Sequence, residues 1–352
     1  MDVPDCAAGT GIWGSARSEN SERKRDTMRD QYQREIDYLR ISVTDRCNFR
    51  CRYCMPAKGV EFVEHSEIMT YEEILRFLRV AAGTGIRKVK VTGGEPLVRK
   101  GVCGFIRKVR NIPGIESVTL TTNGALLEEH LPELEAAGIT GINVSLDTLD
   151  PEKFHQITRC DDFGRVWSGI RAATQTKIPV KVNCIPMKGC NEEELAKIAA
   201  LAKEYPITVR FIEMMPIGMG TGYARILQDE IKSLLEDRFG TMELVDEILG
   251  NGPAGYYKIA DFKGRIGFIS AVSHEFCKSC NRIRLTADGI LKPCLNFESR
   301  VNLKKEMRSG MTDEELEQLL KNVIYHKPRC HAFGDETKKD IQEKRRMAGI
   351  GG

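Results

Sequence analysis

The sequence predicts an α/β fold, an incomplete (β/α)6 TIM-like barrel with a C-terminal region that closes the barrel mouth. Six short β-rich runs alternate with helical patterns over about 180 residues, which implies a parallel sheet with right-handed crossovers. The chain has 352 residues, 41% of them hydrophobic, which is enough for one large barrel with an extension. After about residue 225 the strand-helix rhythm breaks, so a separate C-terminal region is expected.

The barrel elements are predicted from β-branched runs and from apolar residues at helical spacing. The expected strands span residues 39–43, 88–92, 117–121, 141–146, 179–185 and 208–213. The expected helices cover residues 71–82, 128–137, 163–176 and 191–204. The first helix has a start signal, because Thr70 precedes it and Glu73 follows three residues later, as in a capping box. Reactive groups in such a fold gather at the carboxyl ends of the strands.

The chain divides into four predicted parts. Residues 1–33 lack apolar periodicity and are expected to be a disordered tail. Residues 34–224 form the partial barrel. Residues 225–340 form the C-terminal region, with a helix at 228–239, strand-like runs at 256–262 and 266–270, and a helix after Thr312. Residues 341–352 are expected to be a flexible tail that ends in Gly-Gly.

Charge and hydropathy exclude several classes of protein. The chain carries 53 Lys and Arg against 50 Asp and Glu, a net charge of +3, so we expect neither nucleic-acid nor membrane binding. No apolar run approaches the roughly 20 residues that span a bilayer, and no signal peptide is evident, so we expect a cytoplasmic protein. Twelve cysteines in such a chain indicate metal ligation before disulfides.

Six of the cysteines fall into two groups whose spacing indicates metal binding. Cys47, Cys51 and Cys54 form C-x3-C-x2-C in a loop after the first strand. Three thiolates favour a 4Fe-4S cluster with one open iron over structural zinc, which takes four ligands. The second group, Cys277, Cys280 and Cys294, forms C-x2-C-x13-C. The scattered cysteines are predicted to be packing residues: Cys6, Cys103, Cys160, Cys184, Cys190 and Cys330.

The first cysteine loop, C-N-F-R-C-R-Y-C-M, resembles the cluster loop of the radical S-adenosylmethionine enzymes. A second motif, V-T-G-G-E-P at residues 91–96, resembles their glycine-rich motif; its glycines allow close backbone approach to a ligand, and Glu95 can meet an ammonium group. The resemblance implies S-adenosylmethionine as cofactor, with Thr121 and Asn123 near the same strand ends. The residues it places on S-adenosylmethionine are Tyr53, Gly94, Ser145 and Met215.

The second cysteine group is ambiguous by spacing alone. It fits either a second cluster or zinc with a fourth ligand such as His274 or Cys330. Its surroundings, F-C-K-S-C-N-R-I-R-L with a later Pro-Cys, closely resemble the C-terminal site of the GTP 3',8-cyclase family. That resemblance runs from about residue 36 to the C-terminus and implies a second 4Fe-4S cluster that binds the guanine of GTP.

The basic residues of the strands fit a triphosphate, which needs several converging Lys or Arg donors. Lys88 and Lys90 share one face of their strand with Thr92, and Lys181 points opposite to its flanking valines. The residues predicted to bind GTP are Arg40, Lys88, Lys90, Thr121, Lys181, Arg210, Arg282 and Arg284. Two positions depart from the family pattern: Lys90 stands where Arg is usual, and the usual Gly-Arg before the first strand reads Gln33-Arg34. The Gly351-Gly352 terminus resembles a family tail that reaches toward the active site.

The resemblance implies a lyase that converts GTP to (8S)-3',8-cyclo-7,8-dihydroguanosine 5'-triphosphate, the first step of molybdenum cofactor (molybdopterin) biosynthesis. The cluster at Cys47, Cys51 and Cys54 generates the radical, and Arg282 and Arg284 assist catalysis. The family further implies an unidentified electron donor, cyclic pyranopterin monophosphate synthase downstream, and a possible homodimer.

Two alternative functions stay open. A peptide-modifying radical enzyme with an auxiliary cluster usually needs more C-terminal cysteines than these three. A non-catalytic iron-sulfur or zinc adaptor has no use for the glycine-rich motif or the inward lysines.

Overall fold

The computed structural model describes residues 27–246, 249–345 and 347–351, so most of the predicted tail at 1–33 lies outside the described residues. Its centre is an eleven-stranded sheet in the order β11-β10-β1-β2-β3-β4-β5-β6-β9-β8-β7. The six predicted barrel strands are confirmed and pair in parallel, in chain order. They are β1 (Tyr38–Ser42), β2 (Lys88–Thr92), β3 (Ser117–Thr122), β4 (Gly141–Ser145), β5 (Val180–Cys184) and β6 (Thr208–Ile212).

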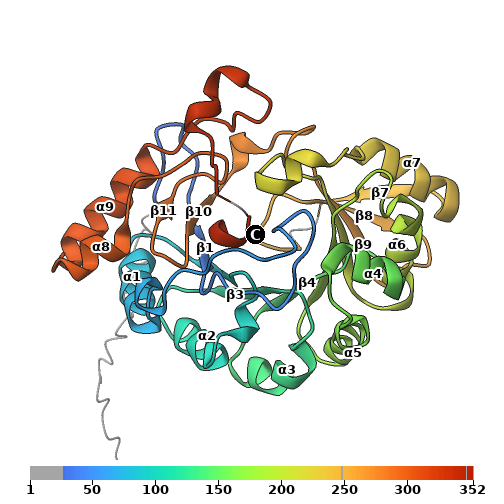
Figure 1. The fold of residues 1–352 in the computed structure, drawn as a ribbon, viewed down its shortest axis with the longest axis horizontal. Coiled ribbons are helices and arrows are strands. Elements are labelled where there is room, and N and C mark those ends of the chain that lie inside the picture. Colours follow the sequence, from blue (N-terminus) through green and yellow to red (C-terminus); the bar gives the residue numbers. More distant parts are fainter. Residues whose placement is uncertain (1–26, 247–248, 346, 352) are drawn as a thin grey trace, which may run out of the picture.

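Helices cover the outer face of this curved sheet (Figure 1). They are α1 (Tyr71–Gly83), α2 (Val102–Arg110), α3 (Leu127–Ala136), α4 (Pro151–Thr158), α5 (Phe163–Thr174) and α6 (Leu195–Glu204). The capping box at α1 is confirmed, because Thr70 Oγ1 accepts the Glu73 N–H at 3.1 Å and Glu73 accepts the Thr70 N–H at 2.7 Å. We did not predict α2 and α4, although Asp150 caps α4 and Pro151 begins it.

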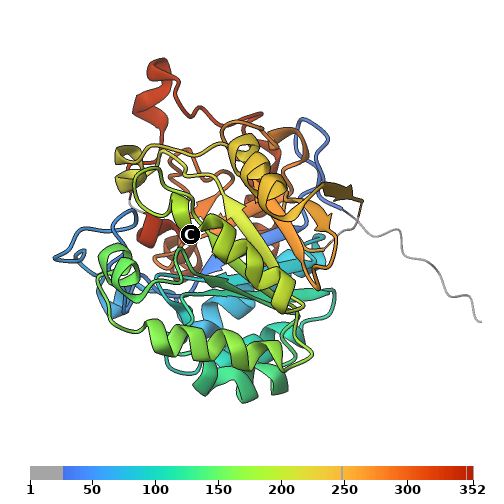
Figure 2. The same cartoon turned by 90° about the vertical axis from the view of Figure 1, so that its right-hand side faces the viewer.

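The C-terminal region extends the same sheet at both edges. Strand β9 (Arg265–Ile269) pairs in parallel with β6, and β10 (Arg282–Leu285) pairs in parallel with β1. The other elements are α7 (Gln228–Phe239), β7 (Met242–Val245), β8 (Gly255–Ile259), β11 (Leu291–Lys292), α8 (Leu303–Arg308) and α9 (Asp313–Tyr325). Residues 225–340 therefore share one sheet with the barrel and fold over it, as the turned view shows (Figure 2).

Short helices complete the chain. Six of those in the described part are 3-10 helices: η1 (His65–Glu67), η2 (Pro96–Val98), η3 (Glu192–Glu194), η4 (Gly218–Gly222), η5 (Cys277–Ser279) and η6 (Glu336–Ile341). The last helix, α10 (Met347–Ile350), lies inside the ring of strands (Figure 1).

The described part of the predicted flexible tail is packed against the protein. Glu343 forms a buried ion pair with Lys292, and Ile350 is also buried. The sequence analysis missed this because the lysine partner lies 51 residues away in the chain.

Side chains alternate between the two faces of each barrel strand. In β5, Val180, Val182 and Cys184 are buried on the helix side, while Lys181 and Asn183 face the interior of the ring. Polar residues inside the ring therefore converge on the space between the strands. Within the described part of the chain, no helix has the length and apolar character to cross a membrane.

Candidate active site

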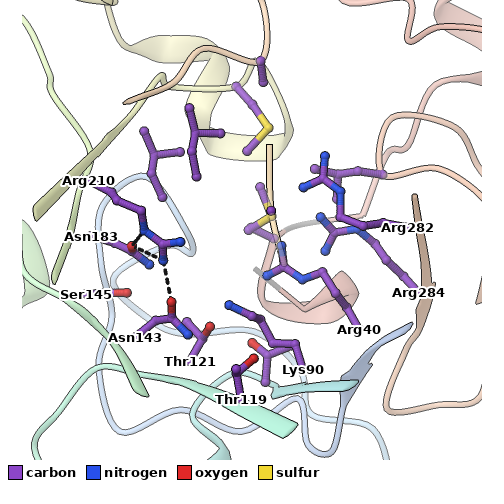
Figure 3. Close-up of a pocket in the computed structure, with 18 of the residues that line it drawn as sticks. Arg40, Lys90, Thr119, Thr121, Asn143, Ser145, Asn183, Arg210, Arg282 and Arg284 are labelled. Atoms are coloured by element: carbon purple, nitrogen blue, oxygen red, sulfur yellow. Dashed lines mark hydrogen bonds between the residues drawn. The ribbon is translucent and has the colours of Figure 1, made fainter. Parts of the chain in front are cut away.

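A cavity of about 440 Å³ lies inside the ring and joins both cysteine groups (Figure 3). All the predicted site residues except Lys88 line it: Arg40, Cys47, Cys51, Tyr53, Cys54, Lys90, Gly94, Thr121, Ser145, Lys181, Arg210, Met215, Cys277, Cys280, Arg282, Arg284 and Cys294. The structure therefore brings together residues that are spread over most of the chain.

The first cysteine loop follows β1 and is held by arginines outside the cavity. Arg50 Nη1 donates to the carbonyl oxygens of Cys47 at 2.6 Å and of Phe49 at 2.8 Å. Arg159 Nη1 donates to the Arg50 carbonyl at 2.8 Å and to that of Met55 at 3.1 Å. These bonds satisfy the carbonyls of a loop with no regular secondary structure. The loop is fixed, so its three thiols have defined positions.

The glycine-rich motif packs directly against this loop. The Gly94 N–H donates to the Thr44 carbonyl at 2.7 Å. A side chain at either glycine would collide with that loop, because a Cβ on Gly93 would lie 2.7 Å from the Thr44 carbonyl oxygen and one on Gly94 2.7 Å from the Arg46 carbonyl carbon. Glycine is needed here for close backbone approach.

Glu95 is held by hydrogen bonds at the ends of β2 and β3. Its carboxylate accepts hydrogen bonds from Thr122 Oγ1 at 2.8 Å, from the Asn123 N–H at 2.6 Å and from the Leu97 N–H at 3.0 Å. Burial raises its pKa to about 7, although these bonds act in the opposite direction. Glu95 thus joins the end of β2 to that of β3, and it is not among the residues that line the cavity.

Tyr53 is oriented by a buried carboxylate that the sequence analysis did not single out. Its hydroxyl donates to Asp147 Oδ2 at 2.7 Å, and the Ile185 N–H donates to Asp147 Oδ1 at 2.8 Å. Burial raises the pKa of Asp147 to about 6 despite these bonds. Asp147 follows the end of β4 by two residues, where a polar residue after a buried strand could have signalled it.

The second cysteine group lies at the opposite side of the cavity, around β10. Cys277 begins η5, Cys280 follows its last residue, and Cys294 follows β11. Burial raises the pKa of Cys280, but Lys327 and Arg282 outweigh it and lower the pKa to about 6. Lys327 Nζ also donates to the Arg282 carbonyl at 2.8 Å and to the Pro293 carbonyl at 2.5 Å. The sequence analysis missed Lys327, which follows α9 and is not near either motif.

A row of cations crosses the cavity between the two cysteine groups. Strand register places Arg284 beside Arg40 and Arg40 beside Lys90, on three adjacent parallel strands. Neighbouring strands are about 4.8 Å apart, so these charges repel one another. Figure 3 shows Arg40, Lys90, Arg282 and Arg284 converging on one side of the cavity, with Arg210 opposite.

Two asparagines hold the guanidinium of Arg210, a role that carboxylates usually have. Arg210 Nη2 donates to Asn143 Oδ1 at 2.5 Å, and its Nε donates to Asn183 Oδ1 at 2.9 Å (Figure 3). Asn143 Nδ2 donates to the Leu120 carbonyl at 2.7 Å, which fixes the orientation of its amide. Asparagine carries no charge, so it positions the guanidinium without neutralising it. Both asparagines alternate with apolar residues, the pattern that identified Lys181.

The surroundings of these cations lower their pKa values. Burial lowers the pKa of Arg40 to about 10. Burial and the nearby Arg210 lower the pKa of Lys181 to about 7. Burial, with four nearby cations, lowers the pKa of Lys90 well below its usual range. An anion bound among these groups would favour their charged forms and so raise their pKa values.

Lys88 lies apart from this cluster. Its ammonium pairs with Asp37 at 2.7 Å and is not among the cavity-lining residues. The alternation of β2 places it on the same face as Lys90, but at the first residue of the strand. Its role in GTP binding stays a prediction that this position does not favour.

The first cysteine loop fits a 4Fe-4S cluster. Its three thiols line the cavity, and the Phe49 N–H and Asn123 Nδ2 lie 3.4 and 3.9 Å from the Cys47 sulfur, as donors to cluster thiolates do. Among the described residues, no three His, Cys, Asp or Glu side chains are arranged to hold a single metal ion.

The fold and the cysteine loop define a radical S-adenosylmethionine enzyme, and residues 41–202 match the Radical SAM superfamily. Such an enzyme uses a 4Fe-4S cluster and S-adenosylmethionine. The fold is also that of Streptococcus suis SuiB bound to S-adenosylmethionine, with a TM-score of 0.58 and 15% sequence identity, over 83% of this chain and 66% of that one.

Residues 207–333 match Molybdenum Cofactor Synthesis C. Curated relatives named GTP 3',8-cyclase are 43% identical in Clostridium perfringens and 45% identical in Desulforamulus reducens and Heliobacterium modesticaldum. Each alignment covers 92% of this chain and 100% of the relative. The chain belongs to the GTP 3',8-cyclase family, whose place is in molybdenum cofactor biosynthesis.

Proposed function

We propose that this chain converts GTP to (8S)-3',8-cyclo-7,8-dihydroguanosine 5'-triphosphate in the cavity between its two cysteine groups. The observation that carries the proposal is the composition of the cavity wall. Among the described residues, seven Lys and Arg side chains line it: Arg40, Lys90, Lys181, Arg210, Arg282, Arg284 and Lys327. Asp147 is the one carboxylate among the described lining residues, and it is bonded to Tyr53 beside the first cysteine loop. Such a concentration of basic side chains with one carboxylate suits a triphosphate.

Residues beside the first cysteine loop bind S-adenosylmethionine in this proposal. Tyr53, Gly94, Ser145 and Met215 line the same part of the wall. When bound, a 4Fe-4S cluster at Cys47, Cys51 and Cys54 supplies the electron that cleaves S-adenosylmethionine, and the resulting radical takes the 3' hydrogen of GTP. Asp147 fixes the ring of Tyr53 through its hydroxyl.

Residues of the second cysteine group hold the guanine end of GTP. Cys277, Cys280 and Cys294 would hold a second 4Fe-4S cluster with one open position, and Arg282 and Arg284 point into the same cavity (Figure 3). Arg282 and Arg284 orient the substrate, and Thr121 contacts it from β3. Arg40, Lys90, Lys181 and Arg210 bind the triphosphate. Each of these assignments rests on position and charge.

The pathway context extends the proposal. The product is consumed by cyclic pyranopterin monophosphate synthase, an external electron donor reduces the enzyme, and both steps take place in the cytoplasm. A homodimer is the assembly expected from the family.

The test separates the two cysteine groups in reconstituted, anaerobically reduced protein. Cys51→Ser abolishes cleavage of S-adenosylmethionine, whereas Cys280→Ala keeps some cleavage but yields no cyclised product. Cys330→Ser is the matched control, because Cys330 is exposed and is not among the cavity-lining residues. Normal cyclisation by Cys280→Ala would refute the assignment of the substrate site. Wild-type protein is expected to carry about eight irons per chain, and about four would refute the second cluster.

A further inference from the structure

A buried arginine outside the cavity, Arg34, connects the N-terminal segment to the second cysteine group. It is 7% exposed and precedes β1 by four residues. Its Nε donates to Asp30 Oδ2 at 2.6 Å, and Asp30, 1% exposed, also accepts the N–H groups of Tyr32 at 2.9 Å and Arg34 at 3.0 Å. Asp30 therefore fixes the direction of the guanidinium and neutralises its charge.

The other guanidinium nitrogens donate to main-chain carbonyls more than 240 residues away. Arg34 Nη1 donates to the carbonyl oxygens of Cys277 at 2.7 Å and of Arg329 at 2.9 Å. Arg34 Nη2 donates to the carbonyl oxygens of Pro328 at 2.7 Å and of Lys327 at 3.4 Å. One side chain thus joins the turn that carries Cys277 to the turn after α9. A planar group with five donors is suited to this arrangement, and an ammonium with three is not.

The turn after α9 that Arg34 holds also contacts the segments that carry Cys280 and Cys294. Lys327 Nζ donates to the carbonyls of Arg282 and Pro293, which adjoin Cys280 and Cys294 closely in sequence. On the other side of the turn, His331 Nε2 lies 2.7 Å from the Ala271 carbonyl oxygen, and the His331 backbone hydrogen-bonds the Cys277 thiol. All three cysteines are therefore positioned by contacts that begin at Asp30 and Arg34.

We propose that Arg34 is a positioning residue of the second cysteine group, which sets the spacing of Cys277, Cys280 and Cys294 before any cluster is bound. The inference rests on the proposed function only in naming that group a cluster site. It differs from a general role in folding because Arg34 contacts carbonyls in the two turns that carry and support these cysteines.

The test uses iron-free, full-length protein and measures alkylation of each cysteine by mass spectrometry. Arg34→Lys keeps the positive charge but loses the planar guanidinium with its five donors. We expect Cys277 to react at least about tenfold faster in this variant, because the loss of one charge-assisted hydrogen bond accounts for that factor. Arg29→Lys is the matched control: Arg29 is also an N-terminal arginine, but its pair with Glu35 is exposed. Buried Cys103 and Cys184 report global unfolding.

The outcomes separate this proposal from the proposed function. Faster alkylation of Cys277 with Cys103 and Cys184 still protected supports a positioning role. Unchanged alkylation of Cys277 overturns it. An equal increase in the alkylation of Cys277, Cys103 and Cys184 also overturns it. After reconstitution, Arg34→Lys is expected to fall from about eight to about four irons per chain while it keeps uncoupled cleavage of S-adenosylmethionine. If wild-type protein itself holds about four irons, the second cluster fails, but the alkylation result still decides the role of Arg34.

Discussion

Binding of GTP is predicted to draw protons onto Lys181 and Lys90. Burial and Arg210 lower the pKa of Lys181 to about 7, and burial among four cations lowers that of Lys90 well below its usual range. A triphosphate beside them favours the charged forms and restores both pKa values toward their usual range. At about pH 8, one unit above its pKa, Lys181 is about nine-tenths neutral before GTP binds, so it alone takes up about 0.9 proton per GTP. Lys90 adds to this number.

The assay is titration calorimetry of GTP in buffers that differ in ionisation enthalpy. Lys181→Arg and Lys90→Arg are matched variants, because arginine keeps the positive charge throughout the accessible pH range. Each is expected to lower the proton uptake, and the double variant to abolish most of it. Equal uptake by the wild type and the double variant would refute the assignment of these two lysines to the triphosphate.

The same shift has a consequence for stability without substrate. The folded pKa of Lys181, about 7, lies below its value of 10.5 in the unfolded chain, so the unfolded state binds more protons between these two values. The contribution of Lys181 to the free energy of unfolding is therefore present above pH 10.5 and is lost as the pH falls to about 7. Lys181→Met is expected to remove that dependence in denaturant titrations.

Three further changes test individual contacts. Gly94→Ala places a methyl group against the Arg46 carbonyl, so it is expected to cost about 1–3 kcal/mol and to weaken binding of S-adenosylmethionine, measured by equilibrium dialysis; unchanged binding contradicts the close approach. Gln33→Gly is expected to raise the free energy of unfolding by about 0.5–1 kcal/mol, because Gln33 has φ of 63°; a destabilised variant would argue against this conformation. Glu343→Ala leaves Lys292 buried without its partner and is expected to cost about 3–5 kcal/mol in denaturant unfolding; a cost near zero would show that the C-terminal segment is not anchored there.

Local patterns predicted the barrel strands and the helices with clear start signals. The predicted bounds of the strand at 88–92 match the structure, because β-branched residues alternate with lysines there. Thr70 and Glu73 marked the start of the helix at 71–82. The cysteine spacing and the inward direction of Lys181 also follow from neighbouring residues. Each of these depends on interactions within a few positions of the chain.

Contacts between distant segments could not be predicted in the same way. The pairing of β10 with β1 joins residues about 244 positions apart, and no local pattern encodes it. The alternation of side chains along the strand predicted which face Lys88 occupies. It did not predict how far along the barrel Lys88 lies, at a level where it pairs with Asp37. Arg34 reads as an ordinary loop arginine until its four carbonyl partners, all more than 240 residues away, are known.

The central claim, that GTP lies between the two cysteine groups with its ribose toward the first, is tested most directly by following one hydrogen. Reconstituted, reduced protein is given GTP that carries deuterium at the 3' carbon, and the 5'-deoxyadenosine formed is analysed by mass spectrometry. We expect that GTP stimulates formation of 5'-deoxyadenosine and that the 5'-deoxyadenosine formed with GTP carries the deuterium. Formation that GTP does not stimulate, or that leaves the deuterium behind, would contradict this placement of GTP.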